Sequence, residues 1–565
     1  MKHPLMTRLL AGAAFSLFSG NALALPATIP NSVRPDTFQR QNEIEDQRPA
    51  VGGAPIVTDE TVKAKHSGST ATFELKGIKL EGATVYTEEQ LQPLYANKLN
   101  TKITLDDLNQ IAADVTAYYR NHGYILTRAI VPPQKESNGV FTLRIVEGFV
   151  NEVKLTGDVG KGNDDLLNAY ADKIRNAKPL NSEKLERYLL LMEDLPGVEA
   201  RAVLAPAANV QGATDVIITI TRRSVEASAS LDNRGSRYLG PEEATASLFL
   251  NNLVGRDDQT QLRVSNTIFN PSEMLFGEVR HTEPVGTEGT TIMFAANKVR
   301  TEPGDNLKPL DIVGDSGAFS VTATHPFIRS RRTNWFVTSD FTFRNVEVDT
   351  LGASLYKDKT RVLTLGTSYD FVDNLAGINK LEANIGHGFN FDTGEGADAR
   401  SRANGNTDFT KMTGRVTRVQ PIYGPFSLYG SASGQYAYQA LLASEEFTIG
   451  GSEYGSAYDS AEISGDSGVA ARAELQYNQS VNNQYIQQYQ IYTFYDIGKV
   501  WNRDAVTGTE DSEDSLSSAG IGARLNLLNS VTAGVEGAVP LTRDVAARDG
   551  AGDDARVFFN LQYRY

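Results

Sequence analysis

The chain has 565 residues, no cysteine and a formal net charge of −15, from 54 lysines and arginines against 69 aspartates and glutamates. The lack of cysteine excludes a disulfide-stabilised fold and a cysteine-ligated zinc site. The acidic charge disfavours a protein that binds nucleic acid. The sequence has no run of about 18 or more apolar residues, which excludes a helical membrane protein. A membrane β-barrel stays possible, because its strands carry apolar residues only at every second position.

The N-terminus has the three parts of a secretory signal peptide. Lys2 and Arg8 carry positive charge, an apolar stretch follows at 9–18, and Ala22-Leu23-Ala24 matches a cleavage site. We therefore predict that residues 1–24 are removed on export; the alternative is a short buried helix. Export without cysteine is typical of the periplasm or outer membrane of a Gram-negative cell.

The next section, residues 25–71, is polar and contains five prolines, which predicts an extended linker. One segment within it, residues 37–47, is compatible with a helix. The alternative for this section is a disordered mature N-terminus.

Between residues 72 and 223, apolar residues recur three and four positions apart, as they do on amphipathic helices. The clearest helix covers residues 104–119, with Thr104 as its N-cap and Gly123 as its stop signal. The first unit is expected to contain strands at 73–80, 124–131 and 140–147 and helices at 87–96 and 104–119. The second is expected to contain strands at 153–155, 198–204 and 214–220 and helices at 164–175 and 181–194. We predict two β-α-α-β-β domains, each large enough to have its own core.

From residue 224 to the end, the apolar period changes from 3.6 to 2. One face of the last predicted strand carries Val557, Phe559, Leu561, Tyr563 and Tyr565. A sheet that crosses lipid must close, because lipid offers no partner to an open edge, and its faces then meet lipid and a polar lumen. At about 20 residues per strand and connection, residues 224–565 predict a transmembrane β-barrel of about 16 antiparallel strands. The alternative is a soluble β-sandwich or solenoid.

Four runs in this chain match motifs of one known family and occur in the family's order. They are Tyr118-Tyr119-Arg120-Asn121-His122-Gly123-Tyr124 with Pro132-Pro133-Gln134, Leu195-Pro196-Gly197-Val198, Leu231-Asp232-Asn233-Arg234-Gly235, and His325-Pro326-Phe327-Ile328-Arg329-Ser330-Arg331. With two small modules ahead of an exported barrel, they resemble the two-partner secretion transporters. These are the TpsB type (ShlB, FhaC and HecB), within the superfamily of BamA. The resemblance covers nearly the whole mature chain.

The resemblance implies a role for each section of the mature chain. Residues 25–71 would carry a plug helix and a linker, and residues 72–148 and 149–223 would be two POTRA domains in the periplasm. Residues 224–565 would be the outer-membrane barrel, with a long loop near 447–467 that folds back into it.

The family's loop motif is only partly present. Relatives carry V-R-G-Y or G-R-A-Y at the loop tip, and the arginine pairs with an aspartate on the inner wall. The matching residues here are Gly450, Gly451, Tyr454, Gly455, Ser456, Ala457, Tyr458 and Asp459. Ser456 stands at the place of the arginine and offers one neutral hydrogen bond instead of a charge-assisted pair. Either Tyr454, Tyr458 or another arginine holds the loop, or its tip is more mobile.

The wall aspartate of the motif is present. Phe494, Asp496 and Gly498 match the family's F-x-D-x-G-x-V strand. Period two places Asp496 on the same face as Gln490 and Tyr492, which we expect to face the lumen. The resemblance implies that Asp496 takes part in holding the loop. The alternative is a wall charge that only solvates the lumen.

We predict no catalytic residues, no cofactor and no metal site. Gly-Asp-Ser-Gly occurs at 314–317 and 465–468 and resembles a protease signature. We expect both copies in turns between strands, and a catalytic serine needs a base held against it. The six histidines have no metal-ligand spacing, and no phosphate-binding loop is present.

The resemblance implies that the POTRA domains recognise an unfolded exoprotein of adhesin or haemolysin type (the TpsA type), which then crosses the barrel to the cell surface. An extended chain adds readily to an exposed sheet edge, and the strands at 124–131 and 201–204 are candidates. We expect outer-membrane lipid as a further partner, no nucleic acid, and a monomer. The alternative is a BamA- or TamA-like insertase, which usually has more than two POTRA modules.

Overall fold

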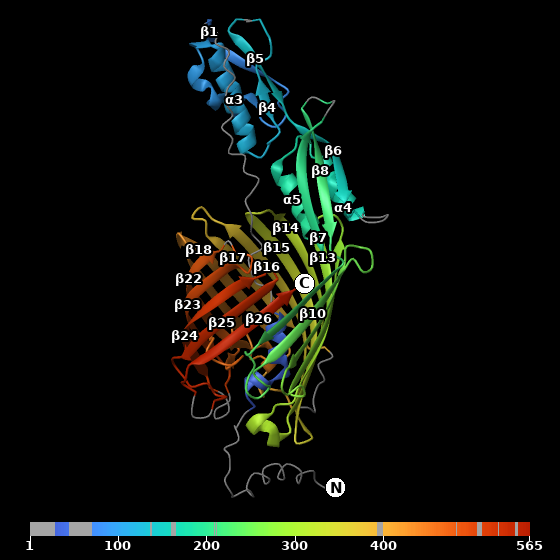
Figure 1. Cartoon of the computed structure of the whole chain (residues 1–565), viewed down its shortest axis with the longest axis vertical. Coiled ribbons are helices and arrows are strands. Elements are labelled where there is room, and N and C mark those ends of the chain that lie inside the picture. The colour runs from blue at the N-terminus through green and yellow to red at the C-terminus, as the bar shows by residue number, and fades with distance from the viewer. Residues whose placement is uncertain are drawn as a thin grey trace.

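The computed structural model describes residues 29–43, 71–135, 138–159, 165–207, 210, 212–391, 399–481, 483–505, 511–528, 530–548 and 552–565. The predicted signal peptide, residues 1–24, and the linker at 44–70 lie outside these residues. Two small α+β domains follow one another in line and lead to a large β-barrel (Figure 1). Within the described part of the chain, no helix is long and apolar enough to cross a bilayer.

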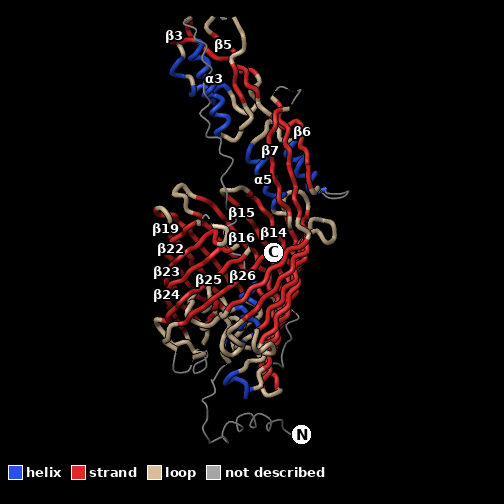
Figure 2. Tube along the Cα trace, in the orientation of Figure 1, coloured by secondary structure: helices blue, strands red, loops and turns tan. Residues whose placement is uncertain are grey.

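The predicted barrel is confirmed. Sixteen strands of the described chain form one closed antiparallel sheet, in which the last strand returns to pair with the first (Figure 2). They are β9 Val225–Asp232, β10 Glu243–Asn251, β11 Gln259–Thr267, β12 Met274–Val285, β13 Thr290–Thr301, β14 Val313–Arg329, β15 Thr333–Thr350, β16 Ala353–Val372, β17 Ile378–Gly388, β18 Thr410–Tyr423, β19 Phe426–Ala437, β22 Ser467–Ser480, β23 Ile486–Trp501, β24 Glu513–Leu527, β25 Val531–Pro540 and β26 Arg556–Arg564. A short 3-10 helix, η5 Asp305–Leu310, lies between β13 and β14.

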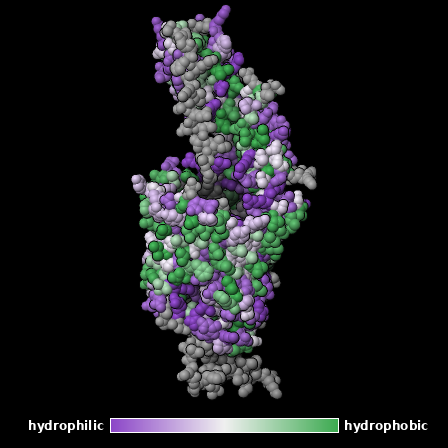
Figure 3. All heavy atoms as spheres, in the orientation of Figure 1, coloured by the Kyte–Doolittle hydropathy of each residue, from purple (hydrophilic) through white to green (hydrophobic). Residues whose placement is uncertain are grey.

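Side chains alternate along these strands as period two predicts. On β19, Leu428 and Tyr436 are 47% and 49% exposed, whereas Ser427 and Gln435 are 7% and 8% exposed. On the face of the barrel drawn in Figure 3, the outward residues form an apolar band. The lumen is therefore polar and the outer face is apolar, as a bilayer requires.

The first small domain has a three-stranded sheet in the order β2-β5-β4. Its elements are β1 Thr72–Leu75, β2 Gly77–Glu81, α2 Glu88–Leu91, β3 Thr101–Thr104, α3 Leu105–Asn121, β4 Arg128–Ile130 and β5 Val140–Val146. The apolar face of α3, with Ile111 and Val115, packs on Leu143 and Ile145 of β5. Strand β4 is shorter than the strand expected at 124–131.

Two expectations for this domain are wrong. The helix expected at 87–96 ends at Leu91 and continues as 3-10 turns, η3 Gln92–Leu94 and η4 Ala96–Lys98. Pro93 explains the break, because proline cannot donate a helical hydrogen bond and restricts the residue before it. The strand expected at 73–80 is two strands, and β1 pairs with β3 while β2 pairs with β5.

The second small domain follows the predicted order closely. Its elements are β6 Phe149–Gly157, α4 Asp165–Arg175, α5 Ser182–Glu193, β7 Val198–Pro206 and β8 Ala213–Arg222, and the sheet order is β6-β8-β7. Helix α5 also contacts the barrel. Arg187 donates to the carbonyl of Pro326 at 3.0 Å, and Asp194 pairs with Arg329 at 2.7 Å. The predicted family run at 325–331 thus lies where this domain meets the barrel.

The barrel encloses two further pieces of the chain. One is a 3-10 turn, η2 Asn31–Val33, followed by helix α1 Pro35–Glu43, drawn in blue among the strands in Figure 1. The other is the connection between β19 and β22, which contains η6 Ala443–Glu445, β20 Phe447–Ile449 and β21 Ile463–Gly465.

The first Gly-Asp-Ser-Gly copy does not form the expected turn, because residues 314–317 lie within β14. Gly314 and Ser316 face the lumen: a Cβ on Gly314 would meet the ring of Pro35, and Ser316 donates to Gln39 at 2.8 Å. The small residues here allow helix α1 to approach the wall. In the second copy, Asp466 lies between β21 and β22 and pairs with Arg402 at 2.6 Å.

The N-cap of α3 supports one stability prediction. Asp107 N–H donates to the Thr104 hydroxyl at 3.2 Å, and the Asp107 carboxylate accepts from Thr104 N–H at 2.9 Å. Hydrogen bonds from Lys98 and Thr104 lower the pKa of Asp107 from 3.8 to about 2. The carboxylate therefore stabilises the helix above about pH 4, and this contribution is lost as the pH falls towards 2.

We expect Thr104→Ala to destabilise α3 by about 1 kcal/mol, since the cap accepts a helical N–H that is otherwise unpaired. Hydrogen exchange of the α3 amides in the full-length protein measures this change. Lys79→Ala, an exposed change on β2, is the control. Equal exchange in both variants would contradict the role of the cap.

Candidate functional site

The loop tip meets the inner wall at Ser456 and Asp496. The backbone N–H of Ser456 donates to Oδ2 of Asp496 on β23 at 2.9 Å. The Ser518 hydroxyl on β24 donates to the same oxygen at 3.1 Å. Ser456 and Asp496 are both fully buried. The structure thus brings together the two positions that the resemblance pairs, although serine replaces arginine.

The cation beside Asp496 comes from Arg472 on the adjacent strand β22. Arg472 and Asp496 are directly opposite in the β22–β23 register. Nη1 of Arg472 lies 3.3 Å from each oxygen of Asp496 and donates to the hydroxyl of Ser456. Of the alternatives that the sequence leaves open, another arginine is therefore one that contacts the loop tip.

Arg472 is shared among several acceptors. Its Nε donates to Glu474 at 2.8 Å, and its Nη2 lies 3.2 Å from Glu536. The ring of Phe494 packs against the guanidinium, whose carbon lies 4.1 Å from the centre of the ring. The Arg472 side chain is only 5% exposed. Removing one partner of a buried ion pair costs about 3–5 kcal/mol, so this arginine is central to the site.

Two more arginines hold the backbone of the loop tip. Arg234, just after β9, donates to the carbonyl of Ser456 at 3.1 Å and to Glu536 at 2.7 Å. Arg556, the first residue of β26, donates to the carbonyl of Ala457 at 2.9 Å and pairs with Asp459 at 2.7 Å. Since β9 and β26 close the barrel, the tip is bonded to both sides of the closure.

The two tyrosines of the motif anchor the loop to the wall. The Tyr458 hydroxyl lies within donating distance of the carbonyls of Ser517, at 3.2 Å, and Arg543, at 3.1 Å. The Tyr454 hydroxyl lies 2.8 Å from that of Ser431 on β19. Both rings are buried. They add to the arginine contacts and do not replace them.

The glycines of the two motifs make room for this packing. Gly450 has a φ of +128°, and a Cβ there would meet backbone from the other side of the loop. Gly451 and Gly455 also have positive φ. On the wall, Gly498 faces Ile449, whose side chain fills the space that a Cβ would need.

Helix α1, with Arg34 just before it, is bonded to the first part of the same loop. Arg34 donates to the carbonyl of Ala443 at 2.9 Å, and Arg40 donates to the carbonyl of Glu446 at 2.6 Å. On the opposite side, Phe38 packs edge to face on Phe276 of β12, with ring centres 5.6 Å apart. The loop therefore links the helix to the wall, and both lie across the lumen.

Sequence reasoning identified Asp496 and the loop motif but missed the arginines. Arg472 lies on the face of β22 that also carries Glu474 and Gln476, and period two was sufficient to assign that face to the lumen. Its position opposite Asp496 depends on the β22–β23 register, which the sequence does not determine. Arg556 is likewise placed by register and by the fold of the loop.

Comparison with known proteins agrees with this architecture. The sequence model of the "Haemolysin secretion/activation protein ShlB/FhaC/HecB" family matches residues 212–525, and that of the "POTRA domain, ShlB-type" matches residues 73–148. The heme/hemopexin transporter protein HuxB of Haemophilus influenzae is 23% identical over 551 residues, which is 94% of this chain and 96% of HuxB. The outer membrane transporter CdiB of Dickeya dadantii is 22% identical over 473 residues, 82% of this chain and 83% of CdiB.

A solved structure has the same fold. CdiB from Escherichia coli superposes with a TM-score of 0.76 at 19% sequence identity. The alignment covers 96% of this chain and all of the CdiB chain.

The loop lock can be tested by moving the arginine. We expect Arg472→Ala to free the loop tip, because it leaves Asp496 and Glu536 without this cation, at a cost of about 3 kcal/mol or more. A cysteine introduced at Ser460 would report the change as faster maleimide labelling, since the chain has no other thiol. The double variant Ser456→Arg and Arg472→Ser moves the arginine from the wall to the loop, and it should restore slow labelling. Arg300→Ala, at a 52% exposed side chain on β13, is the control.

Unchanged labelling of Arg472→Ala would contradict the lock. Labelling that rises equally in Arg300→Ala would show a general loosening of the barrel instead.

Proposed function

The chain belongs to the haemolysin secretion/activation (ShlB/FhaC/HecB) family, and from this membership we propose that it is an outer-membrane translocator of two-partner secretion. It recognises an unfolded exoprotein of adhesin or haemolysin type through its POTRA domains and exports it through the barrel to the cell surface. One observation carries the proposal: a closed barrel with a helix and a loop across its lumen follows directly on two small domains at one end.

The barrel lies in the outer membrane, and the POTRA domains lie in the periplasm. Strand β9 begins at Val225, directly after β8 of the second POTRA domain ends at Arg222. This end of the barrel is therefore periplasmic. The opposite end, with Asp232, the loop tip and Arg556, is extracellular.

Exposed sheet edges in the POTRA domains are suited to capturing an unfolded chain. In the second domain, β7 is an edge strand, and its Val203 and Leu204 are 63% and 39% exposed. In the first domain, β4 is an edge strand. An extended segment that pairs with such an edge gains backbone hydrogen bonds with little demand on its sequence. Strand β7 contains the segment expected at 201–204, and β4 lies within the segment expected at 124–131.

Export requires that α1 and the loop leave the lumen. The contacts of α1 and of Arg34 just before it include hydrogen bonds from Arg34, Arg40 and Gln39, an ion pair between Arg34 and Glu446, and the packing of Phe38. Such contacts break one at a time without unfolding the barrel, whose strands are paired to one another. We therefore assign α1 the role of a plug that is displaced during export.

We propose that the chain has no catalytic activity and no cofactor, acts as a monomer, and contacts outer-membrane lipid through its apolar band. A BamA- or TamA-like insertase is the second candidate from the sequence. The secretion family model, which covers residues 212–525, favours the translocator.

The capture step predicts that a charge on the β7 edge blocks export. We expect Val203→Lys to lower secretion of the partner exoprotein about tenfold, since an edge lysine opposes strand addition. Val140→Lys is the matched control, because Val140 is 43% exposed but lies on the central strand β5. Secretion is measured by immunoblot of the medium, with equal barrel levels in the outer membrane. Equal secretion by both variants would refute capture at β7, and intact secretion after deletion of residues 72–148 would refute a role for the first POTRA domain.

The plug assignment predicts a change in conductance. Deleting residues 29–43 should raise single-channel conductance in planar bilayers severalfold, because the helix occupies the lumen. The double change Arg34→Ala and Arg40→Ala should raise the fraction of time spent open. Lys298→Ala, at a 73% exposed side chain on β13, is the control. A deletion variant with the conductance of the full chain would show that α1 is not a plug.

A further inference from the structure

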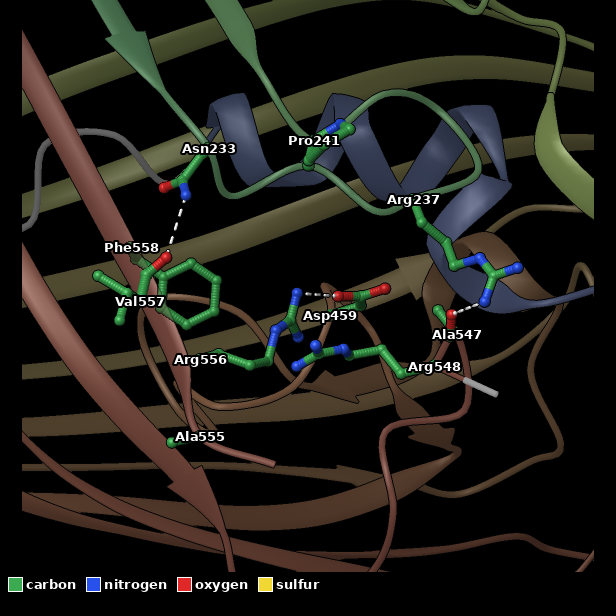
Figure 4. A pocket seen from close by; sticks show the side chains of 11 residues that line it. Asn233, Arg237, Pro241, Asp459, Ala547, Arg548, Ala555, Arg556, Val557 and Phe558 are labelled. Atoms are coloured by element: carbon green, nitrogen blue, oxygen red, sulfur yellow. Dashed lines mark hydrogen bonds and ion pairs between the residues drawn. The ribbon is translucent and has the colours of Figure 1, made fainter. Parts of the chain in front are cut away.

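Two cavities lie at opposite ends of the barrel. The larger, of about 490 Å³, is lined in part by Asp459 and Arg556, whose ion pair Figure 4 shows, and it belongs to the site already described. The smaller, of about 300 Å³, lies at the periplasmic end, where the second POTRA domain joins the barrel. We call it the junction cavity. Its lining includes Arg222, Arg223, Ser224, Val225, Leu250 and Leu253.

One side of the junction cavity is part of the lipid-facing wall. Val225 of β9 and Leu250 of β10 are partners in the strand register. Leu250 lies on the same side of β10 as Leu248, which is exposed, whereas Ser247 and Asn251 on the other side are buried. Val225 and Leu250 therefore face the acyl chains of the bilayer.

The periplasmic turn between β10 and β11 extends this apolar surface. Leu253 and Val254 are neighbours in the turn and are 61% and 64% exposed. Leu253 also lines the junction cavity. Adjacent large apolar side chains that are open to solvent mark a contact surface, and at the rim of a membrane barrel the surface they meet is lipid.

Two arginines form the polar side of the junction cavity. Arg222 is paired with Asp257 at 2.7 Å. The guanidinium of Arg223 is exposed and forms no hydrogen bond or ion pair within the described part of the chain. None of the residues that line the cavity, all of which the structure describes, is acidic. The junction cavity therefore carries an uncompensated positive charge, although the chain as a whole is acidic.

The main chain holds Arg223 in this position. Its N–H donates to the carbonyl of Gly197 at 2.8 Å, and its carbonyl accepts from Nδ2 of Asn251 at 2.8 Å. Gly197 has a φ of +68°, and a Cβ there would meet the carbonyl of Arg223. The family run at 195–198 thus fixes the arginine beside the lipid-facing wall.

We propose that the junction cavity binds an anionic phospholipid of the periplasmic leaflet, of the phosphatidylglycerol type. The guanidinium of Arg223 meets the phosphate, whose oxygens match its planar donors, and the hydroxyl of Ser224 is a further donor. The acyl chains lie along Val225 and Leu250. A zwitterionic headgroup brings its own cation, so the uncompensated arginine favours an anionic one. This inference deepens the lipid contact of the proposed function, because it names the lipid class and its site.

The test measures lipid selectivity beside the cavity in the full-length protein, reconstituted in phosphatidylcholine vesicles. Val254→Cys carries a fluorescent label on the turn, since the chain has no other thiol. Part of the lipid has brominated acyl chains, which quench a nearby fluorophore, and this part is either phosphatidylglycerol or phosphatidylcholine. Leu375→Cys is the control site. It is 74% exposed in another periplasmic turn, where Arg418 is paired with Asp373 at 2.6 Å.

We expect brominated phosphatidylglycerol to associate at Val254→Cys about fivefold more strongly than brominated phosphatidylcholine, because one arginine at the membrane surface supplies roughly this preference. Arg223→Gln should abolish the preference. Arg332→Gln, which removes an exposed arginine from the periplasmic turn between β14 and β15, should leave it unchanged. Glycerol phosphate in solution should not lower the preference, since it lacks acyl chains to lie on Val225 and Leu250.

Equal association of the two lipids at Val254→Cys would overturn the proposal, as would a preference that survives Arg223→Gln. An equal preference at Leu375→Cys would overturn it too, because the whole periplasmic rim would then attract anionic lipid. Competition by glycerol phosphate would assign the cavity to a free anion instead. Quenching by phosphatidylcholine at both sites reports the lipid contact of the barrel itself, so failure of this site is distinguishable from failure of the proposed lipid contact.

Discussion

Backbone amides inside a bilayer have no partner except one another, and this constraint shapes the whole C-terminal part of the chain. It requires a closed sheet, which the sixteen described strands form. Closure separates two environments, so period-two strands put residues such as Leu428 outside and Gln435 inside. The polar lumen that results is the setting in which α1, the loop and many charged side chains lie.

Charges in that lumen need partners, and Arg472 shows how the chain keeps them paired without the arginine of the family's loop motif. The cation is on the wall, opposite Asp496 in the strand register, and the loop contributes the N–H and hydroxyl of Ser456. A loop arginine would take its charge away when the loop moves. Here the ion pair of Arg472 and Asp496 lies wholly on the wall, so it does not depend on the loop for its charges.

The sequence predicted most of the fold because period-two and period-3.6 patterns follow directly from burial. Helix α3 and its Thr104 cap lay where the pattern placed them. Two failures have local causes: Pro93 stopped a helix, and Gly314 and Ser316 are small where α1 packs on β14, not because the chain turns. For the site, Asp496 followed from a motif. Arg472 and Arg556 did not, because their roles depend on register and on how a long loop folds, and neither has a periodic signal.

The closure itself is the least regular part of the barrel, and side chains complete it where the backbone does not. The β9–β26 pairing continues past the pair of Asp232 and Asn560 by one backbone hydrogen bond, from the N–H of Asn233 to the carbonyl of Phe559 at 3.4 Å. Beyond it, Asn233 bonds the edge of β26, while Arg234 and Arg556 bond the two strands to the loop tip. Side-chain hydrogen bonds exposed to water exchange more readily than a ladder in lipid, because water supplies alternative partners. The barrel therefore combines backbone pairing through the wall with side-chain hydrogen bonds at the extracellular end of its closure.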